Sequence, residues 1–223
     1  MPREDIDDEV MNEVFRLGVE SGYLDLAMLP LLAALTTRRL GLLCYLQGQD
    51  IRRKHGVMVA QSSSVVFVKG VWRRVPVKTD ASLTYFVLHE KLVATGFPDW
   101  ASRRPGFIFE AVHDYKDPPK STSKLVNSLL RDAGAHPGVQ VFHCLRGDGI
   151  TEMREQNIDP RARRLQAGHA IGGDEHDKYG RRSLIESECK KLATTEITRN
   201  IDWKIFKNLD FDKLAAKRRR HDK

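Results

Sequence analysis

Two segments of the sequence place cationic and proton-transferring side chains inside otherwise apolar surroundings. Arg38 and Arg39 follow the apolar run LLAALTT, and the segment FHCLRG separates His143 from Arg146 by three residues. On a helix, this spacing places two side chains on one face. Guanidinium groups pair with two oxygens at once and keep their charge, so such arginines could stabilise a phosphate under attack. Taken singly, each pair is more often an ordinary polar surface feature than part of a site.

A third segment, AGHAIGGDEHDKYG (167–180), concentrates polar groups in a short run. These groups are His169, Asp174, Glu175, His176, Asp177 and Tyr179. They could form a metal site, position Tyr179 as a nucleophile, or belong to a solvated loop. The sequence contains neither an HExxH motif nor a two-histidine-carboxylate spacing, which disfavours the metal site.

The overall composition indicates which kind of binding partner and which cellular compartment to expect. The chain of 223 residues carries a net charge of +7, which favours an anionic partner such as nucleic acid. No apolar run approaches the roughly 20 residues that a membrane span requires, so we expect no membrane association. The three cysteines are widely spaced and form no CxxC pair, which favours a reducing cytoplasm over a disulfide framework.

The elements that must position these residues are mainly helical. Apolar spacing predicts helices at 5–20, 24–36, 39–46, 81–96, 122–133, 141–156, 159–170, 182–195 and 202–219. Valine-rich runs broken by Gly and Ser predict strands at 56–61, 64–70 and 71–77. Pro and polar clusters predict loops at 98–106 and 114–124. The fold class that follows is α+β, a mainly α-helical domain with a small three-stranded antiparallel β-sheet inserted early.

The order of the polar residues along the chain resembles the catalytic domain of the tyrosine recombinase (phage integrase) family. The segment ALTTRRLGLLCYLQGQDI (34–51) is similar to the first arginine box of that family, and its Leu46 and Asp50-Ile51 set a register that selects Arg39 rather than Arg38. The segment from FHCLRG to Gly168-His169 is similar to the second box, and Tyr179 follows it. The resemblance covers about residues 24–190 and implies the DNA breaking-rejoining fold.

The family also places a lysine in a β-hairpin before an Arg-x-Val-Pro strand. The segment RRVPV (73–77) is similar to that strand, which indicates Lys69 in VFVKGVW, with Lys78 as the alternative. In the chemistry that the resemblance implies, Lys69 protonates the departing 5′-oxygen. Tyr179 attacks phosphorus to form a 3′-phosphotyrosyl intermediate, and His143 accepts a proton or donates to the phosphate. A phenol with a pKa of about 10 needs such assistance to lose its proton.

The phosphate itself is held, by the same resemblance, by Arg39, Arg146 and His169. Cleavage and rejoining of this kind require neither a metal ion nor a cofactor. The implied function is a site-specific recombinase or integrase that acts on double-stranded DNA together with other protomers, as a tetrameric synapse in the full-length protein. Two alternatives remain, namely DNA relaxation of the type IB topoisomerase kind and DNA binding without catalysis. The implied setting is a bacterial or phage-derived protein of the cytoplasm, associated with the nucleoid.

The sequence departs from the pattern of the family at Leu42, Gly147 and Gly149. Leu42 stands where the family often has an acidic residue, and Gly147 and Gly149 each cost up to ~1 kcal/mol inside a helix. We expect a single catalytic domain over 1–223, with a core at about 5–195, a C-terminal helix and basic tail at 196–223, and no N-terminal core-binding domain. The amphipathic segment 200–217 either docks on a neighbouring protomer or packs on its own domain.

Overall fold

A buried central helix organises the fold. The computed structural model describes residues 4–68, 70–75, 80–171 and 183–219. In it, α2 (Leu24–Thr36) is apolar on all sides and nearly every residue is buried, as expected of a helix enclosed by others. Three other long helices pack against it, namely α1 (Asp8–Glu20), α6 (Pro118–Asp132) and α7 (Phe142–Glu155).

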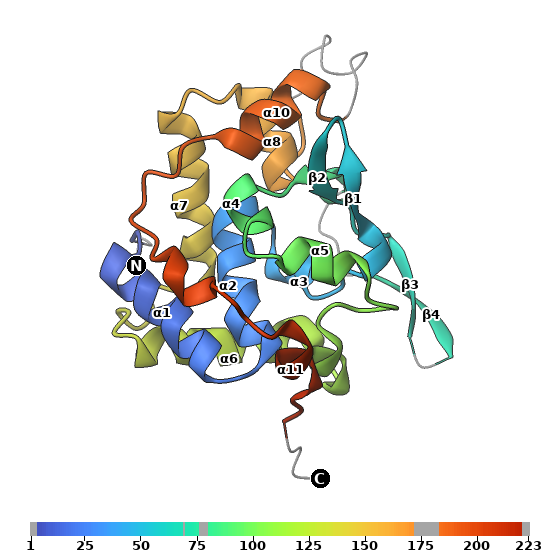
Figure 1. Cartoon of the computed structure of the whole chain (residues 1–223), viewed down its shortest axis with the longest axis vertical. Coiled ribbons are helices and arrows are strands. Elements are labelled where there is room, and N and C mark those ends of the chain that lie inside the picture. The colour runs from blue at the N-terminus through green and yellow to red at the C-terminus, as the bar shows by residue number, and fades with distance from the viewer. Residues whose placement is uncertain (1–3, 69, 76–79, 172–182, 220–223) are drawn as a thin grey trace.

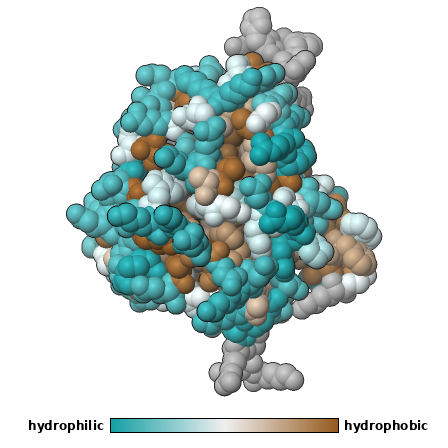
Figure 2. All heavy atoms as spheres, in the orientation of Figure 1, coloured by the Kyte–Doolittle hydropathy of each residue, from teal (hydrophilic) through white to brown (hydrophobic). Residues whose placement is uncertain are grey.

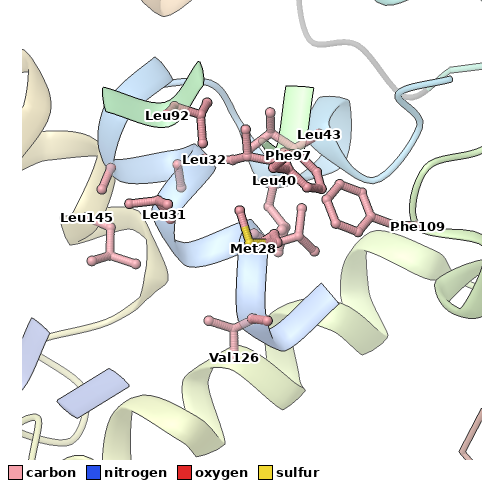
Figure 3. Close-up of a cluster of buried hydrophobic side chains, with 14 of the residues drawn as sticks. Met28, Leu31, Leu32, Leu40, Leu43, Leu92, Phe97, Phe109, Val126 and Leu145 are labelled. Carbon is pink, nitrogen blue, oxygen red and sulfur yellow. The ribbon is translucent and has the colours of Figure 1, made fainter. Parts of the chain in front are cut away.

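The interior of the domain draws side chains from segments far apart in the sequence. Figure 3 shows Met28, Leu31 and Leu32 of α2 between side chains from several other elements. These are Leu40 and Leu43 of α3 (Leu40–Leu43), Leu92 of α4 (Glu90–Val93), Phe97 of α5 (Phe97–Ser102), Phe109, Val126 of α6 and Leu145 of α7. The predicted loop at 98–106 is therefore wrong in its first part, because Phe97 and Trp100 are drawn into this core as α5.

The β-structure is divided between two antiparallel sheets (Figure 1). β1 (Ile51–Lys54), β2 (Val57–Ala60) and β5 (Phe86–Val87) form a three-stranded sheet in that order, in which Ala60 pairs with both Ile51 and Phe86. β3 (Val65–Val68) and β4 (Val71–Arg74) form a separate hairpin. The domain is thus α+β with a small three-stranded sheet, but two of its three strands are not those predicted.

A tight turn and a buried segment explain why the sheet contains strands that were not predicted. His55 and Gly56 both have positive φ, which is the geometry of a tight hairpin turn. This turn allows β1 and β2 to pair as adjacent antiparallel strands. The predicted helix at 81–96 is wrong, because that range folds as η2 (Asp80–Leu83), β5 and α4. Phe86 faces the main core while Val87 faces a second cluster, and this alternation requires a strand.

Six further helical elements complete the described part of the chain, and α8 and α10 contribute to the second cluster. They are η1 (Gly48–Asp50), η3 (Glu110–Asp114), α8 (Pro160–Ala167), α10 (Glu186–Thr194), η4 (Trp203–Phe206) and α11 (Phe211–Ala216). The predicted loop at 114–124 is wrong from residue 118 onward, because Pro118 begins α6 and Asp117 caps it through the Lys120 amide. The other predicted helices are confirmed to within a few residues at their ends.

The C-terminal segment packs on its own domain. The single helix predicted at 202–219 is wrong, because Asn208 has a φ of 58° and Asp210 caps a new helix, so that η4 and α11 are separate. Phe206, Phe211 and Leu214 are buried in the main core. No helix in the described part of the chain is both long and apolar enough to cross a membrane.

Candidate active site

The ends of α2 and α8 bring two predicted site residues, Arg39 and His169, to one place. α2 is followed by Thr37, whose φ of 56° turns the chain away from the helix axis. Arg39 follows in extended conformation and is half-buried. Its Nη1 lies 3.2 Å from the Oγ of Ser82 and 3.4 Å from the carbonyl oxygen of Gly168. Arg39 is therefore held next to the residue that precedes His169.

Arg146 connects the same two helix ends from α7. Its side chain is buried, and its Nε donates to the carbonyl oxygen of Thr37. Its Nη2 lies 3.0 Å from the carbonyl oxygen of Ala167 and 2.5 Å from Nε2 of His169. The structure thus brings together Arg39, Arg146 and His169, three of the six residues that the sequence predicts for the site.

Gly168 makes this arrangement possible. It caps α8 with a φ of 67°, and the following amide of His169 donates to the carbonyl oxygen of Arg164 at 2.8 Å, a common way to end a helix. A Cβ at this position would lie 2.6 Å from Nη1 of Arg38 and 3.2 Å from Cα of Ser82. The Gly-His pair therefore satisfies both a left-handed conformation and a close approach.

Arg38 is a third arginine, directly behind the other two. It is fully buried, and it donates to the carbonyl oxygens of Ser82 at 2.9 Å and of Leu165 at 2.7 Å. Its guanidinium also lies 4.5 Å from the centre of the Phe86 ring. Burial, and then the positive charges of Arg146 and Arg39, lower the pKa of Arg38 to about 9. Arg38 has no face open to a ligand, whereas Arg39 is partly exposed.

Ser82 is a site residue that sequence reasoning missed. Its buried hydroxyl lies between Nη1 of Arg39 and the carbonyl oxygen of Gly168, 3.3 Å from the latter, while its own carbonyl oxygen accepts from Arg38. A serine in a segment predicted to be helical carries no local signal for such a position. Only the folding of 80–88 against α8 brings it between the two arginines.

The resulting site is positively charged and lacks an internal counter-ion among the residues that the structure describes. The hydrogen bonds of Arg38, Arg39 and Arg146 go to carbonyl, hydroxyl and imidazole groups, and none of the three forms a salt bridge within the described ranges. Burying cations away from water is costly unless an anion compensates them. Such a site is suited to an anion, and paired guanidinium groups match the oxygens of a phosphate.

The same cations determine the protonation of His169. Burial, and then Arg146, Arg39, Arg38 and Arg164, lower the pKa of His169 to about 4. At neutral pH the imidazole is uncharged, so its Nε2 accepts the hydrogen bond from Arg146 and its Nδ1 carries the proton. A neutral His169 can donate one hydrogen bond to an incoming phosphate without adding to the local charge.

We expect His169 to remain neutral down to about pH 4 in the free protein, and its pKa to rise when inorganic phosphate binds and offsets the arginine charges. NMR titration of the His169 ring, assigned with His169→Gln, measures both effects. Because the folded-state pKa lies below the unfolded value of 6.5, the unfolded chain takes up the proton first. The contribution of His169 to stability is therefore complete above pH 6.5 and is lost as the pH falls toward 4. Titration near 6.5 without phosphate would contradict this environment.

Of the other predicted residues, the structure describes only His143. His143 lies in the first turn of α7 with its side chain exposed, whereas Arg146 on the same helix is buried. Its predicted role therefore stays a prediction. Lys69, the alternative Lys78 and Tyr179 lie outside the described residues.

The possible metal site in segment 167–180 cannot be placed either. His176 and the acidic residues 174, 175 and 177 lie within 172–182, outside the described residues. Among the residues that the structure does describe, no group of three or more histidine, cysteine or acidic side chains could hold a metal ion. The three cysteines, Cys44, Cys144 and Cys189, are all free and buried.

Comparison with models of known protein families, with curated proteins and with solved structures gave no match.

Proposed function

We propose that the protein is the catalytic domain of a site-specific DNA recombinase of the tyrosine recombinase type. The observation that carries the proposal is the convergence of Arg39, Arg146 and His169 from three separate elements into one site without a paired carboxylate among the described residues. A phosphodiester under attack accumulates negative charge on its non-bridging oxygens, and preorganised cationic donors stabilise that charge. The resemblance in sequence supplies the nucleophile, Tyr179, and the general acid, Lys69.

In the proposed reaction the phenolic oxygen of Tyr179 attacks phosphorus, and the bond from phosphorus to the 5′-oxygen breaks. The phenolic proton passes to His143, and the departing 5′-oxygen takes a proton from Lys69. Arg39 and Arg146 bind the non-bridging oxygens, and His169 donates through Nδ1. The phosphotyrosyl bond conserves the energy of the original bond, so that a second 5′-hydroxyl can reverse the step and rejoin the strands.

The proposal predicts a covalent protein–DNA adduct that depends on Tyr179. Suicide duplexes, nicked near the cleavage position, are prepared from the DNA that flanks the gene, and adducts are resolved under denaturing conditions. We expect an adduct with the unaltered chain, a DNA-modified peptide containing Tyr179 by mass spectrometry, and no adduct with Tyr179→Phe. Tyr23→Phe serves as the matched control, because Tyr23 contacts Lys217 and Arg219 through its ring alone and phenylalanine keeps that ring.

The outcomes separate the alternatives. An adduct that persists in Tyr179→Phe, or that is absent from the full-length protein on its own flanking DNA, would refute the proposal. Relaxation of any supercoiled plasmid, without preference for sequence, would instead indicate the topoisomerase alternative. DNA binding with no adduct on any substrate would indicate a non-catalytic protein.

A further inference from the structure

Arg38 is a buried cation to which the proposed reaction gives no role. Hydrophilic residues cover most of the face that Figure 2 shows, as is usual for a folded protein. Arg38 departs from this pattern, because only 1% of its surface is exposed and it is the largest fully buried side chain that the structure describes. Burying a cation away from water is costly unless an anion compensates it. A charge at this position therefore calls for a function that a neutral side chain would not fulfil.

The hydrogen bonds of Arg38 do not require a charge. Its Nη1 and Nη2 donate to the carbonyl oxygens of Ser82 and Leu165, and Nη2 lies 3.4 Å from Oγ1 of Thr84. Its Nε is buried without a hydrogen-bond partner in the described part of the chain. Nor does Arg38 form a salt bridge with any acidic side chain of the described ranges. A neutral amide could bind the same carbonyl groups at a lower cost of burial.

The C-terminal end of α8 is the negative pole around which three arginines gather. Each arginine binds one carbonyl oxygen there, and the pairs are Arg38 with Leu165, Arg146 with Ala167 and Arg39 with Gly168. The last carbonyl groups of a helix together carry about half an elementary negative charge. Three guanidinium groups exceed this compensation, so the site keeps a positive surplus that a bound anion would reduce.

Arg38 lies directly beside the part of the site that holds Arg39. The two arginines bind opposite ends of Ser82, because Nη1 of Arg38 donates to its carbonyl oxygen while Nη1 of Arg39 lies 3.2 Å from its Oγ. A Cβ added to Gly168 would lie 2.6 Å from the same Nη1 of Arg38. A single residue thus separates the buried guanidinium from the partly exposed one.

The charge of Arg38 also reaches the side of the site that is open to a ligand. His169 is partly exposed. Burial, and then the charges of Arg146, Arg39 and Arg38, lower the pKa of its imidazole to about 4. An anion bound next to this imidazole would experience the same positive potential, with the opposite sign of energy.

We infer that Arg38 is a third cation of the anion site, which acts on a bound phosphate through its charge and does not touch it. Arg39, Arg146 and His169 make the contacts, whereas Arg38 adds positive potential from behind and holds Ser82, which in turn binds Arg39. Attraction between opposite charges extends over several ångströms and is weakened less inside a protein than in water. The inference rests on the proposed function, because that function identifies the anion as a phosphate group.

The experiment compares two replacements of Arg38 by the binding of inorganic phosphate to the full chain. Arg38→Gln keeps N–H donors but loses the charge, whereas Arg38→Lys keeps both. NMR titration of the His169 ring measures phosphate affinity and the pKa of His169 in the same samples. We expect Arg38→Gln to weaken phosphate binding about tenfold, the order expected for one charge several ångströms away in a partly buried site, and to raise the pKa of His169. Arg38→Lys should retain most of the affinity and keep this pKa low.

The matched control for net charge is Lys213→Gln. Lys213 is exposed on α11, which lies at the opposite end of the domain from α8 (Figure 1). Its replacement removes one positive charge, as Arg38→Gln does, but far from the site. We expect the phosphate affinity and the pKa of His169 to equal those of the unaltered chain.

A second pair of variants leaves Arg38 in place, so that the test does not depend on the folding of Arg38→Gln. Thr84 is half-buried, and its Oγ1 lies 3.4 Å from Nη2 of Arg38. Thr84→Asp gives the guanidinium a carboxylate partner, which should weaken phosphate binding and raise the pKa of His169. Thr84→Asn has the same size without the charge and should do neither.

Several outcomes would overturn the inference. These are unchanged phosphate affinity in Arg38→Gln, equal losses in Arg38→Gln and Arg38→Lys, equal effects of Thr84→Asp and Thr84→Asn, and no phosphate binding by the unaltered chain. Phosphate binding is measured without DNA, so the expected effects in a chain that forms no covalent adduct would refute the recombinase alone. Normal adduct formation with no effect of Arg38→Gln on phosphate binding would refute the role of Arg38 alone.

Discussion

Replacement of Arg146 by lysine should lower the rate of covalent DNA cleavage by about 10²- to 10³-fold, the range found when a charge-stabilising donor is removed from an active site. The guanidinium of Arg146 contacts Thr37 through Nε, and it contacts both Ala167 and His169 through Nη2. A lysine has one nitrogen and cannot keep these contacts while it binds a phosphate oxygen. The rate of adduct formation in a single turnover on the suicide duplex measures the effect.

The matched control is Arg154→Lys, because Arg154 lies on the same helix with its side chain exposed. It should cleave at the rate of the unaltered chain. Since lysine preserves the charge, the salt dependence of DNA binding should be the same in both variants, so that a loss confined to cleavage is assigned to the chemical step. Cleavage by Arg146→Lys at an unaltered rate would show that the phosphate binds elsewhere.

Substitution of alanine for Gly149 and for Gly147 should change stability in opposite directions. A Cβ at Gly149 would lie 2.4 Å from the carbonyl oxygen of Ala34 and 2.8 Å from Cγ2 of Thr37, whereas a Cβ at Gly147 meets nothing within 4 Å. Overpacking should lower the free energy of unfolding of Gly149→Ala by about 1–3 kcal/mol. Gly147→Ala should raise it by up to ~1 kcal/mol, because alanine has the better helix propensity. Urea denaturation measures both.

Gly149→Ala should also impair the site beyond its effect on stability. The added methyl group would push α7 away from α2 beside Thr37, whose carbonyl oxygen binds Arg146. Val126→Ala in α6 is the control, because Val126 is buried in the same core but lies on another helix. It should lose a similar amount of stability and keep the rate of cleavage measured under conditions where it is folded. Stability of Gly149→Ala equal to that of Gly147→Ala would contradict the close approach of the helices.

The structure gives a reason for one of the two glycines in α7, Gly149. From the sequence both are unfavourable residues in a helix. In the structure Gly149 permits close contact between the backbones of α7 and α2. This close contact brings Arg146 of α7 within hydrogen-bonding distance of Thr37 at the end of α2. No such reason is found for Gly147, whose surroundings are open.

The long helices could be predicted from the sequence because their signal is local. The apolar spacing of α1, α6 and α7 reports which face each one buries, and the continuous apolar run of α2 reports burial on all sides. The resemblance in residue order predicts that Arg39, Arg146 and His169 belong to one site, and the structure places Arg146 against His169 and Arg39 against Gly168.

The sequence alone could not determine features that depend on contacts between distant segments. Residues 85–88 have helical spacing, but the chain there is extended because it lies between two hydrophobic clusters and because the side chain of Gln166 bonds both the amide and the carbonyl group of Val87, at 2.9 Å each. The same packing places Ser82 between Arg39 and Gly168 and encloses Arg38. The neutrality of His169 follows first from its burial and then from nearby arginines, of which Arg146, Arg39 and Arg38 approach it only in the folded chain. Residue type and order therefore determined which chemical groups the protein has, whereas tertiary packing decided how they are charged and which of them face a ligand, because burial and electrostatic interaction depend on distance in space.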